Sequence, residues 1–191
     1  MQKCDKKLIL ASNSPRRKEL LNKITSDFLI IKSNYDEELK EGACAYEYVR
    51  GCARYKAEDV FNQYAESIIL AADTIVVFNE NEILLKPQNE DEAFGMLKKL
   101  SGSWHKVITA VCIKTREKTL LKHKTSLVKF QKLSDSDILD YIKTGLPFDK
   151  AGSYGIQDQW ARVRIERIKG CIDNIMGLPL KLTKKMLKGA T

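Results

Sequence analysis

The chain has 191 residues, and at about 100 to 200 residues per domain this length predicts a single domain over residues 1–191. With 43% hydrophobic and 30% charged residues, it is neither a disordered polyelectrolyte nor a membrane protein. The net charge of +8 favours an anionic partner but does not choose among a nucleotide, a nucleic acid and an acidic membrane.

The N-terminal segment and the cysteines indicate the compartment. The first apolar segment, residues 8–11, is far shorter than a signal-peptide core of about 7 to 15 residues or a membrane span of about 20. The cysteines are odd in number, form no C-x-x-C pair and are accompanied by only two histidines; they are Cys4, Cys44, Cys52, Cys112 and Cys171. This pattern argues against a disulfide framework and a zinc site. We expect a cytoplasmic protein whose reduced thiols mostly fill its core.

Strands alternate with helices in the first half of the chain. Apolar runs at 7–11 and 28–31 predict strands, and a Pro15 that precedes an apolar stripe predicts a helix between them. Residues 43–65 place apolar side chains at helical spacing. The β-branched run 68–78 and the strand that follows it at 83–85 predict a β-hairpin.

The second half continues the alternation. The expected elements are a helix capped by Asn89 that stops at Gly102, strands at 106–113 and 119–130, a helix at 138–143, a loop at 146–157, a strand at 161–168 and a basic helix at 178–188. Hairpins among alternating strands and helices predict an α/β fold with a mixed sheet.

Polar and basic residues gather at the first strand-to-helix junction, S-N-S-P-R-R from Ser12 to Arg17. Ser14 suits the N-cap, but two arginines in the first turn face the positive end of the helix dipole. Hydroxyls, backbone N–H groups and guanidiniums at a helix start can bind a phosphate. An ordinary capped helix with solvated arginines explains the motif equally well.

Asp73, followed by Thr74, interrupts the apolar run of residues 68–78. An acidic side chain in an apolar strand is rarely buried without a partner, so we expect a bend at the strand edge, at a functional site. There the carboxylate could bind a divalent cation or accept a proton from water. The alternative is a structural aspartate that accepts backbone hydrogen bonds at a turn.

Two lysines are candidate phosphate ligands. Lys56 falls on the apolar stripe of the helix at 43–65, and Lys86 follows the strand at 83–85. Beside a carboxylate and a phosphate cradle, two such lysines are typical of a triphosphate site. An inward lysine can also simply extend its ammonium group to water.

Asp36-Glu37-Glu38 is an acidic cluster after the second expected strand. Asp36 or Glu37 could share a Mg²⁺ ion with Asp73, although a charge run is also typical of a solvated loop. The sequence has no Walker loop, no G-x-G-x-x-G and no H-E-x-x-H motif, so hydride and acyl transfer have no support.

These motifs together resemble the Maf family, the nucleoside triphosphate pyrophosphatases once described as septum formation inhibitors. The resemblance begins with LILASNSPRRKELL at residues 8–21 and continues in family order to residue 180. The further matching segments are KA at 56–57, ADT at 72–74, KP at 86–87, LSG at 100–102, DKAGSYGIQ at 149–157 and GLPL at 177–180.

The resemblance implies a fold similar to that of the inosine triphosphate pyrophosphatases, with an elongated mixed sheet, flanking helices and a cleft between two lobes. It implies hydrolysis of a nucleoside triphosphate between its α and β phosphates, with a divalent metal, Mg²⁺ or Mn²⁺. Asp73 matches the proton acceptor and Glu37 a metal contact shared with Asp73. Ser12, Arg16, Lys56 and Lys86 are then expected on the triphosphate, and a homodimer would be unsurprising.

The branch that the sequence resembles takes dTTP and UTP. The matching features are Arg16, Thr74 after Asp73, and Gln157, whose amide could pair with a pyrimidine edge. The chain departs from the family after Gln157, where Asp158 and Trp160 stand in a segment that usually carries glycines. We expect this departure to affect base preference more than the reaction.

The sequence leaves two alternative functions. Residues 161–191 carry much of the positive charge and could bind nucleic acid, but the chain has no recognisable recognition helix or aromatic platform. The older family name suggests a non-catalytic interaction protein in cell-division arrest. Steeply salt-dependent binding of DNA or RNA would indicate a nucleic-acid-binding protein. Binding to a division partner that survives loss of Asp73 would indicate a non-catalytic interaction protein.

Overall fold

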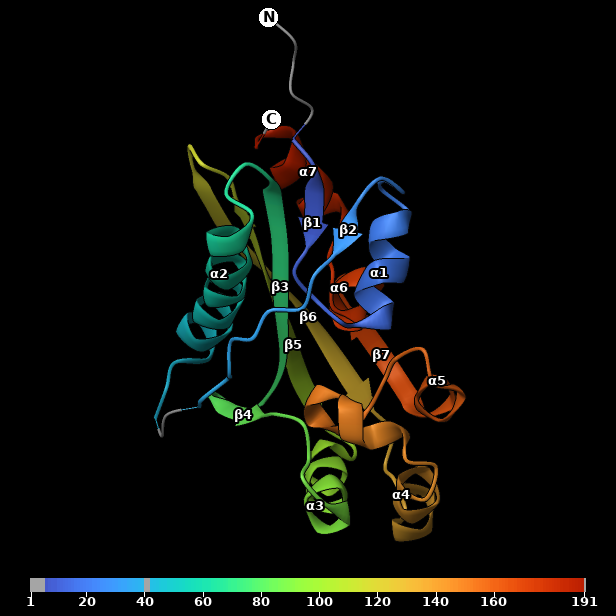
Figure 1. Ribbon diagram of the computed structural model, residues 1–191. Helices are drawn as coiled ribbons and strands as arrows, with labels where there is room; N and C mark the ends of the chain where they lie inside the picture. Colours follow the sequence, from blue (N-terminus) through green and yellow to red (C-terminus); the bar gives the residue numbers. More distant parts are fainter. Residues whose placement is uncertain (1–5, 40–41, 191) are drawn as a thin grey trace, which may run out of the picture. The chain divides into compact units, whose positions relative to one another are not determined.

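The computed structural model describes residues 6–39 and 42–190 (Figure 1). Two compact units divide these residues. The first unit takes its residues from Met1–Asp73, Thr109–Lys124 and Gly177–Thr191, and the second from Thr74–Ile108 and Thr125–Met176. The division falls inside β3, between Asp73 and Thr74.

The described strands form one seven-stranded sheet in the order β2-β1-β3-β5-β6-β7, with β4 paired to β3. Parallel pairs join β1 to β2 and β3, and antiparallel pairs join β3 to β4 and β6 to β7, which confirms a mixed α/β sheet. The strands are β1 (Leu8–Leu10), β2 (Leu29–Ile30), β3 (Ile68–Phe78), β4 (Glu82–Leu84), β5 (Trp104–Lys114), β6 (Thr119–Phe130) and β7 (Ile165–Lys169).

Helices α1 (Pro15–Asn22) and α2 (Ala45–Gln63) connect the parallel strands of the first unit. Helix α1 begins as predicted: Ser14 occupies the N-cap, its hydroxyl accepts a hydrogen bond from the backbone N–H of Arg17, and Pro15 opens the first turn. The chain passes from β1 to β2 on one side and then to β3 on the other side of β1. This reversal makes the end of β1 a topological switch point.

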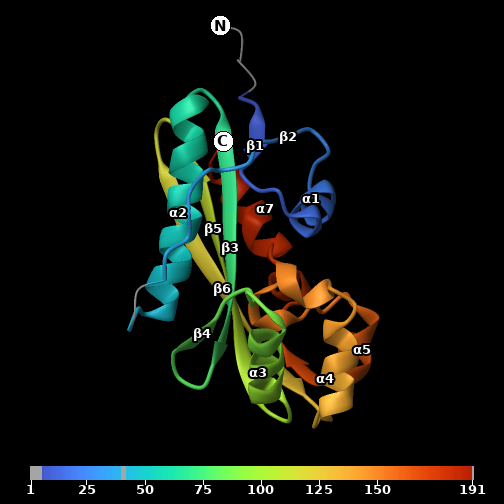
Figure 2. The ribbon, with the colours of Figure 1, turned by 60° about the horizontal axis from the view of Figure 1, so that its bottom comes forward.

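Helix α2 and the C-terminal helix α7 (Leu180–Lys188) pack on opposite faces of the long strands (Figure 2). The β6 residue His123 contacts Tyr46 of α2, with ring centroids 4.9 Å apart. Leu120 lies on the other face of the same strand, beside the residue that ends α7, Gly189. Side chains alternate between faces along a strand, so β6 has apolar or aromatic cover on both faces.

The second unit has its own helices and core. Helix α3 (Glu90–Leu100) begins at Asn89, whose side chain accepts from the N–H of Glu92, and α4 (Asp135–Ile142) begins with a capping box at Ser134. Short helical turns follow at Leu146–Asp149 and Ala151–Ser153. The core of this unit includes the buried side chains of Leu97, Leu100, Val107, Phe130, Ile138 and Tyr141.

The prediction of a strand over residues 161–168 was wrong in its first half. Residues Gln159–Arg164 form helix α5, in which Arg164 lies over the ring of Trp160 one turn away, and β7 starts only at Ile165. From Ile165 onward the chain is a strand because it pairs antiparallel with β6. A further short helix, α6 (Ile172–Met176), was not expected.

The described cysteines are free thiols, as predicted. Cys52 and Cys112 are buried, Cys171 is half-buried and Cys44 is exposed, so only two of these four fill a core; Cys4 lies outside the described residues. Within residues 6–39 and 42–190, no helix has both the length and the apolar character needed to cross a membrane.

Replacement of Gly152 by alanine should destabilise the protein. Gly152 has φ +68°, and a Cβ there would lie 2.8 Å from Cγ2 of Val76. The left-handed backbone and the clash together predict a loss of about 3 kcal/mol in the free energy of unfolding. Gly145→Ala, at φ +72° with nothing within 4 Å of its Cβ, is the matched control and should lose only about 1 kcal/mol. Chemical denaturation measures both; equal losses would contradict the role assigned to Val76.

Candidate active site

The candidate site lies where β3 runs on past the end of β1. Leu10, the last residue of β1, pairs with Leu70, and the N–H of Ala11 still bonds to the carbonyl of Leu70. Three residues further along β3 comes Asp73, and two residues beyond the end of β1 comes Ser12. Ligands of α/β folds bind at this carboxyl end, at a switch point.

Asp73 is buried, with 4% of its surface exposed, and it forms an ion pair with Lys56. Its Oδ1 atom accepts a hydrogen bond from Nζ of Lys56 at 2.6 Å, whereas its buried Oδ2 atom has no hydrogen-bond partner among the described residues. The expected bend is absent, since β3 continues through Asp73. An ion pair, rather than a turn, allows this carboxylate to be buried.

Lys56 connects Asp73 to the acidic loop. It lies on the inward side of α2, as predicted, and its ammonium group also contacts Oε1 of Glu37. One cation therefore faces two carboxylates from separate segments. Of the two acidic residues weighed as metal contacts, the structure brings Glu37 to this cluster, while the side chain of Asp36 is exposed.

Arg17 is a site residue that the sequence prediction missed in favour of Arg16. Its Nε donates to the carbonyl of Gly177 at 3.0 Å, and its Nη1 donates to Oγ of Ser12 at 3.3 Å. Ser12 is buried, and its hydroxyl also accepts from the N–H of Ser14. Arg16 lies half-buried beside it in the first turn of α1. The rotation of α1 decides which arginine turns inward. Two adjacent arginines in the sequence do not by themselves show that rotation.

The charges of this cluster act on one another. Burial raises the pKa of Asp73 and so does the charge of Glu37, while Lys56 and Arg17 oppose that rise. Burial by itself lowers the pKa of Lys56, but the carboxylates of Asp73 and Glu37 outweigh it and the pKa is raised. Lys56 therefore stays a cation, and it is the strongest influence that favours the ionised form of Asp73.

Three of the predicted substrate ligands belong to the second unit. Thr74 is half-buried in β3 directly after Asp73, Lys86 is exposed after β4, and Gln157 is half-buried in the loop before α5. The structure thus brings together Ser12, Glu37, Lys56 and Asp73 in the first unit. The part of Thr74, Lys86 and Gln157 in the same site remains a prediction.

The residues at the cluster fit a hard divalent cation. No group of three or more His, Cys, Asp or Glu side chains lies together in the described part of the chain, so a fully protein-bound metal is not built in. Mg²⁺, however, commonly takes one or two carboxylates and completes its shell with water and substrate phosphates. The buried, unpartnered Oδ2 of Asp73 and the nearby carboxylate of Glu37 are oxygen donors of this kind.

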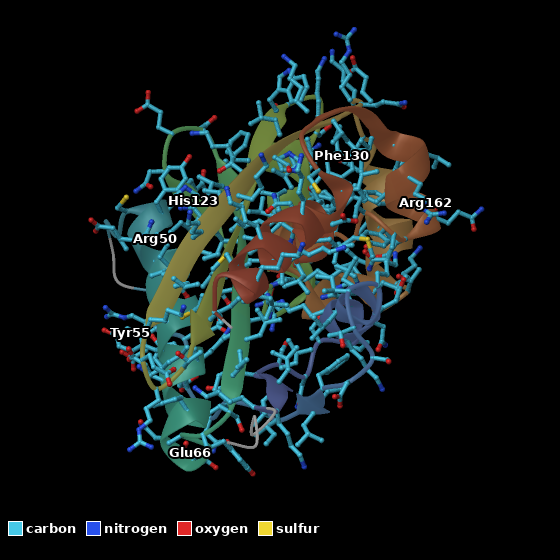
Figure 3. All side chains as sticks on the ribbon, turned by 90° about the horizontal axis from the view of Figure 1, so that it is seen from above. Arg50, Tyr55, Glu66, His123, Phe130 and Arg162 are labelled. Carbon is cyan, nitrogen blue, oxygen red and sulfur yellow. The ribbon has the colours of Figure 1, made fainter. Side chains whose placement is uncertain are left out.

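Neither histidine belongs to this cluster's chemistry. His105 is buried in the second unit with its Nε2 2.7 Å from the hydroxyl of Tyr154, and burial lowers its pKa to about 3, so the ring is neutral. His123 is half-buried, and burial and the charge of Arg50 lower its pKa (Figure 3).

Comparison with known proteins shows the family of this chain. The family model described as "Maf-like protein" matches residues 7–190. The dTTP/UTP pyrophosphatase of Caldicellulosiruptor bescii is 48% identical, over 96% of this chain and 94% of the relative, and that of Aquifex aeolicus is 41% identical, over 95% and 94%. The Staphylococcus aureus Ham1 protein shares the fold, with a TM-score of 0.52 at 15% identity over 97% of this chain and 100% of that one. The chain belongs to the Maf family.

Proposed function

We propose that this protein is a nucleoside triphosphate pyrophosphatase that hydrolyses dTTP and UTP to the monophosphate and pyrophosphate with a divalent metal ion. The observation that carries the proposal is the buried carboxylate of Asp73 at the end of β1 in a Maf family chain. Its ion-pair partner, Lys56, also contacts Glu37. The relatives described as dTTP/UTP pyrophosphatases, 41% and 48% identical over nearly the whole chain, support the substrate class.

Asp73 would act as the general base. A water molecule attacks the α-phosphorus, Asp73 takes one proton from it, and the bond from the α-phosphorus to the bridging oxygen breaks, so that the electron pair leaves with pyrophosphate. The raised pKa of Asp73 makes its carboxylate a stronger proton acceptor than an exposed aspartate.

The basic residues would stabilise the negative charge of the triphosphate. Lys56 and Arg17 line the cluster, and Ser12 and Arg16 lie at the start of α1, where backbone N–H groups also favour an anion. Lys86 of the second unit is proposed as a further phosphate ligand. Catalysis of this kind depends mainly on positioned charge, because negative charge grows on the leaving pyrophosphate.

Glu37 and Asp73 would hold the metal ion. When bound, a divalent cation neutralises phosphate charge and polarises the phosphorus–oxygen bonds.

Base preference is assigned to Gln157, whose side-chain amide offers both a donor and an acceptor, together with Arg16 and Thr74.

Asp73→Asn should abolish most of the activity. Loss of the general base predicts a decrease in kcat/KM for dTTP and UTP of about 10² to 10⁴-fold. Pyrophosphate release from a panel of nucleoside triphosphates with Mg²⁺ measures this effect. Asp140→Asn, an exposed helix position paired only with Lys143 in the described contacts, is the control and should keep wild-type rates. Full activity of Asp73→Asn would refute the assignment.

Glu37→Gln should weaken the response to metal. The isosteric amide keeps the size of the side chain but removes one anionic ligand, so the Mg²⁺ concentration that gives half-maximal activity should rise by at least about ten-fold. Titration of chelator-treated enzyme with MgCl₂ measures it. Glu38→Gln changes an exposed neighbour in the same loop and should match the wild type. Activity that persists in excess EDTA would rule out the metal.

Lys56→Met should move the acidic limb of the pH–activity profile to higher pH. The working base is ionised, so activity falls as pH drops through the pKa of Asp73. Removal of the ammonium group removes the main influence that lowers this pKa, and the pKa therefore rises. The measurement is kcat/KM as a function of pH. The pH at which the acidic limb falls does not depend on how much activity the variant loses overall. Lys114→Met in β5 should leave the limb in place, and a limb unmoved in Lys56→Met would contradict the coupling.

A further inference from the structure

Asp158 occupies the N-cap position of α5 but does not cap the helix. Its side chain makes no capping hydrogen bond; instead, its Oδ2 accepts from the hydroxyl of Tyr141 at 2.5 Å and lies 3.5 Å from Nζ of Lys150. An aspartate at an N-cap normally accepts from the first-turn N–H groups, which stabilises the helix. The carboxylate of Asp158 therefore contacts Tyr141 and Lys150 instead of the N–H groups of α5.

Lys150 is held firmly in this loop. Its side chain is only 6% exposed, and its ammonium group contacts the carbonyl of Leu146, Oδ1 of Asp149 and Oδ2 of Asp158. An ammonium group has three N–H donors, and these three acceptors can take them all. Lys150 therefore links Asp158 to the Leu146 carbonyl and to Asp149.

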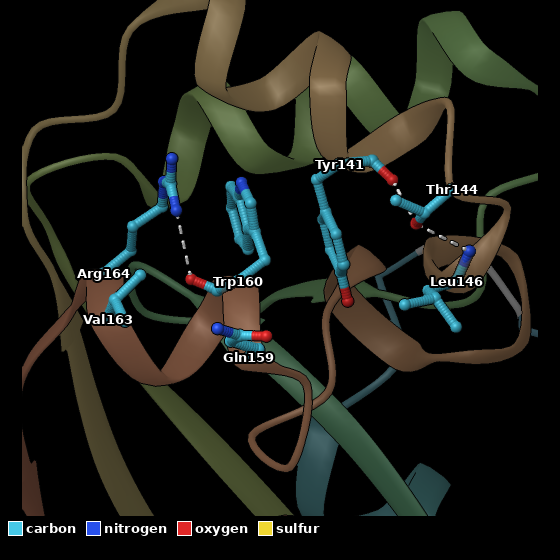
Figure 4. Close-up of a pocket in the computed structure, with 7 residues that line it drawn as sticks. All are labelled: Tyr141, Thr144, Leu146, Gln159, Trp160, Val163 and Arg164. Carbon is cyan, nitrogen blue, oxygen red and sulfur yellow. Dashed lines mark hydrogen bonds between the residues drawn. The ribbon is translucent and has the colours of Figure 1, made fainter.

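The ring of Tyr141 is fixed as well. It stacks on Trp160 with centroids 4.2 Å apart and planes 4° apart, and Figure 4 shows the two rings side by side. The indole N–H of Trp160 donates to the carbonyl of Asp137. The Tyr141 hydroxyl also accepts from the N–H of Gly155 at 3.2 Å, so one hydroxyl links the Gly155 backbone to Asp158.

The Gln157 amide lies in the same small space. A Cβ on Gly155 would be 2.5 Å from Nε2 of Gln157, 2.6 Å from Cε of Lys150 and 2.9 Å from Oδ2 of Asp158. The amide nitrogen and the carboxylate oxygen therefore crowd one point above the glycine. A carboxylate only accepts hydrogen bonds, so it favours the NH₂ end of the amide on its side and leaves the carbonyl end turned away.

We propose that Asp158 is a positioning residue that fixes the orientation of the Gln157 amide and thereby selects UTP over CTP, an inference that rests on the proposed function. Uracil presents the O4 acceptor next to the N3–H donor, whereas cytosine presents the N4 amino donor next to the N3 acceptor. A side-chain amide pairs with either edge, but only after rotation by half a turn. An amide held in one orientation therefore pairs with only one of the two bases. Against the other base, its NH₂ group faces a donor and its carbonyl oxygen faces an acceptor.

Values of kcat/KM for UTP and CTP in the wild type and in Asp158→Asn test the inference. The asparagine keeps the shape but removes the negative charge and replaces one acceptor oxygen with an NH₂ donor, so the preference of the Gln157 amide for one orientation weakens. The wild type should prefer UTP by about ten-fold or more, and Asp158→Asn should lower that ratio by about ten-fold. Asp149→Asn removes the exposed carboxylate that contacts the same lysine and leaves Asp158 in place, so it should keep the wild-type ratio.

Gly155→Ala keeps the inference testable if Asp158→Asn fails to fold, as judged by its melting temperature. The φ of Gly155 is not in the left-handed region, and the nearest atom to its Cβ is Nε2 of the half-buried Gln157, so the added methyl should displace the Gln157 amide and lower the UTP-to-CTP ratio. A wild-type enzyme that hydrolyses both nucleotides equally, or folded variants that keep the ratio, would overturn only the role of Asp158. Release of pyrophosphate from neither nucleotide by the wild type would overturn the proposed function, and this inference with it.

Discussion

The ion pair between Lys56 and Asp73 is the contact on which the candidate site depends. A carboxylate in the middle of an apolar strand is stable only with a partner, and Asp73 is buried because Lys56 reaches it from α2. The same ammonium group contacts Glu37, so one lysine gathers two carboxylates that would otherwise repel each other. The ammonium group of Lys56 therefore has two effects: it allows the carboxylate of Asp73 to be buried, and it favours the ionised form of that carboxylate.

The unequal lengths of two parallel strands make room for this pair. β1 ends after three residues, whereas β3 continues for eight residues beyond the position paired with Leu10. Asp73 lies between Leu70, the last position of β3 that pairs with β1, and Val76, the first that pairs with β4. Ser12 and the start of α1 follow the end of β1. Arg17 is tied there by the carbonyl of Gly177, which begins the C-terminal part of the first unit.

The two units carry different kinds of polar network. In the first unit, basic and acidic groups surround one buried carboxylate, as expected for charge stabilisation. In the second unit, Tyr141, Lys150 and Asp158 form a network built on hydrogen bonds and a ring stack next to Gln157. Such a network holds a side chain in one orientation, which suits discrimination between bases rather than bond cleavage.

The sequence by itself determined the order and type of most elements, because periodicity, Ser14, Asn89 and Ser134 act locally. It also indicated Asp73 and Lys56, because charges in apolar contexts are conspicuous, whereas the choice of Glu37 over Asp36 came only from the family resemblance. Tertiary structure alone decided that Arg17 turns toward Ser12, that β3 runs straight through Asp73, and that residues 159–164 are helical. Each of these depends on a partner distant in the chain, such as Gly177 or Lys56, and local pattern carries no information about such partners.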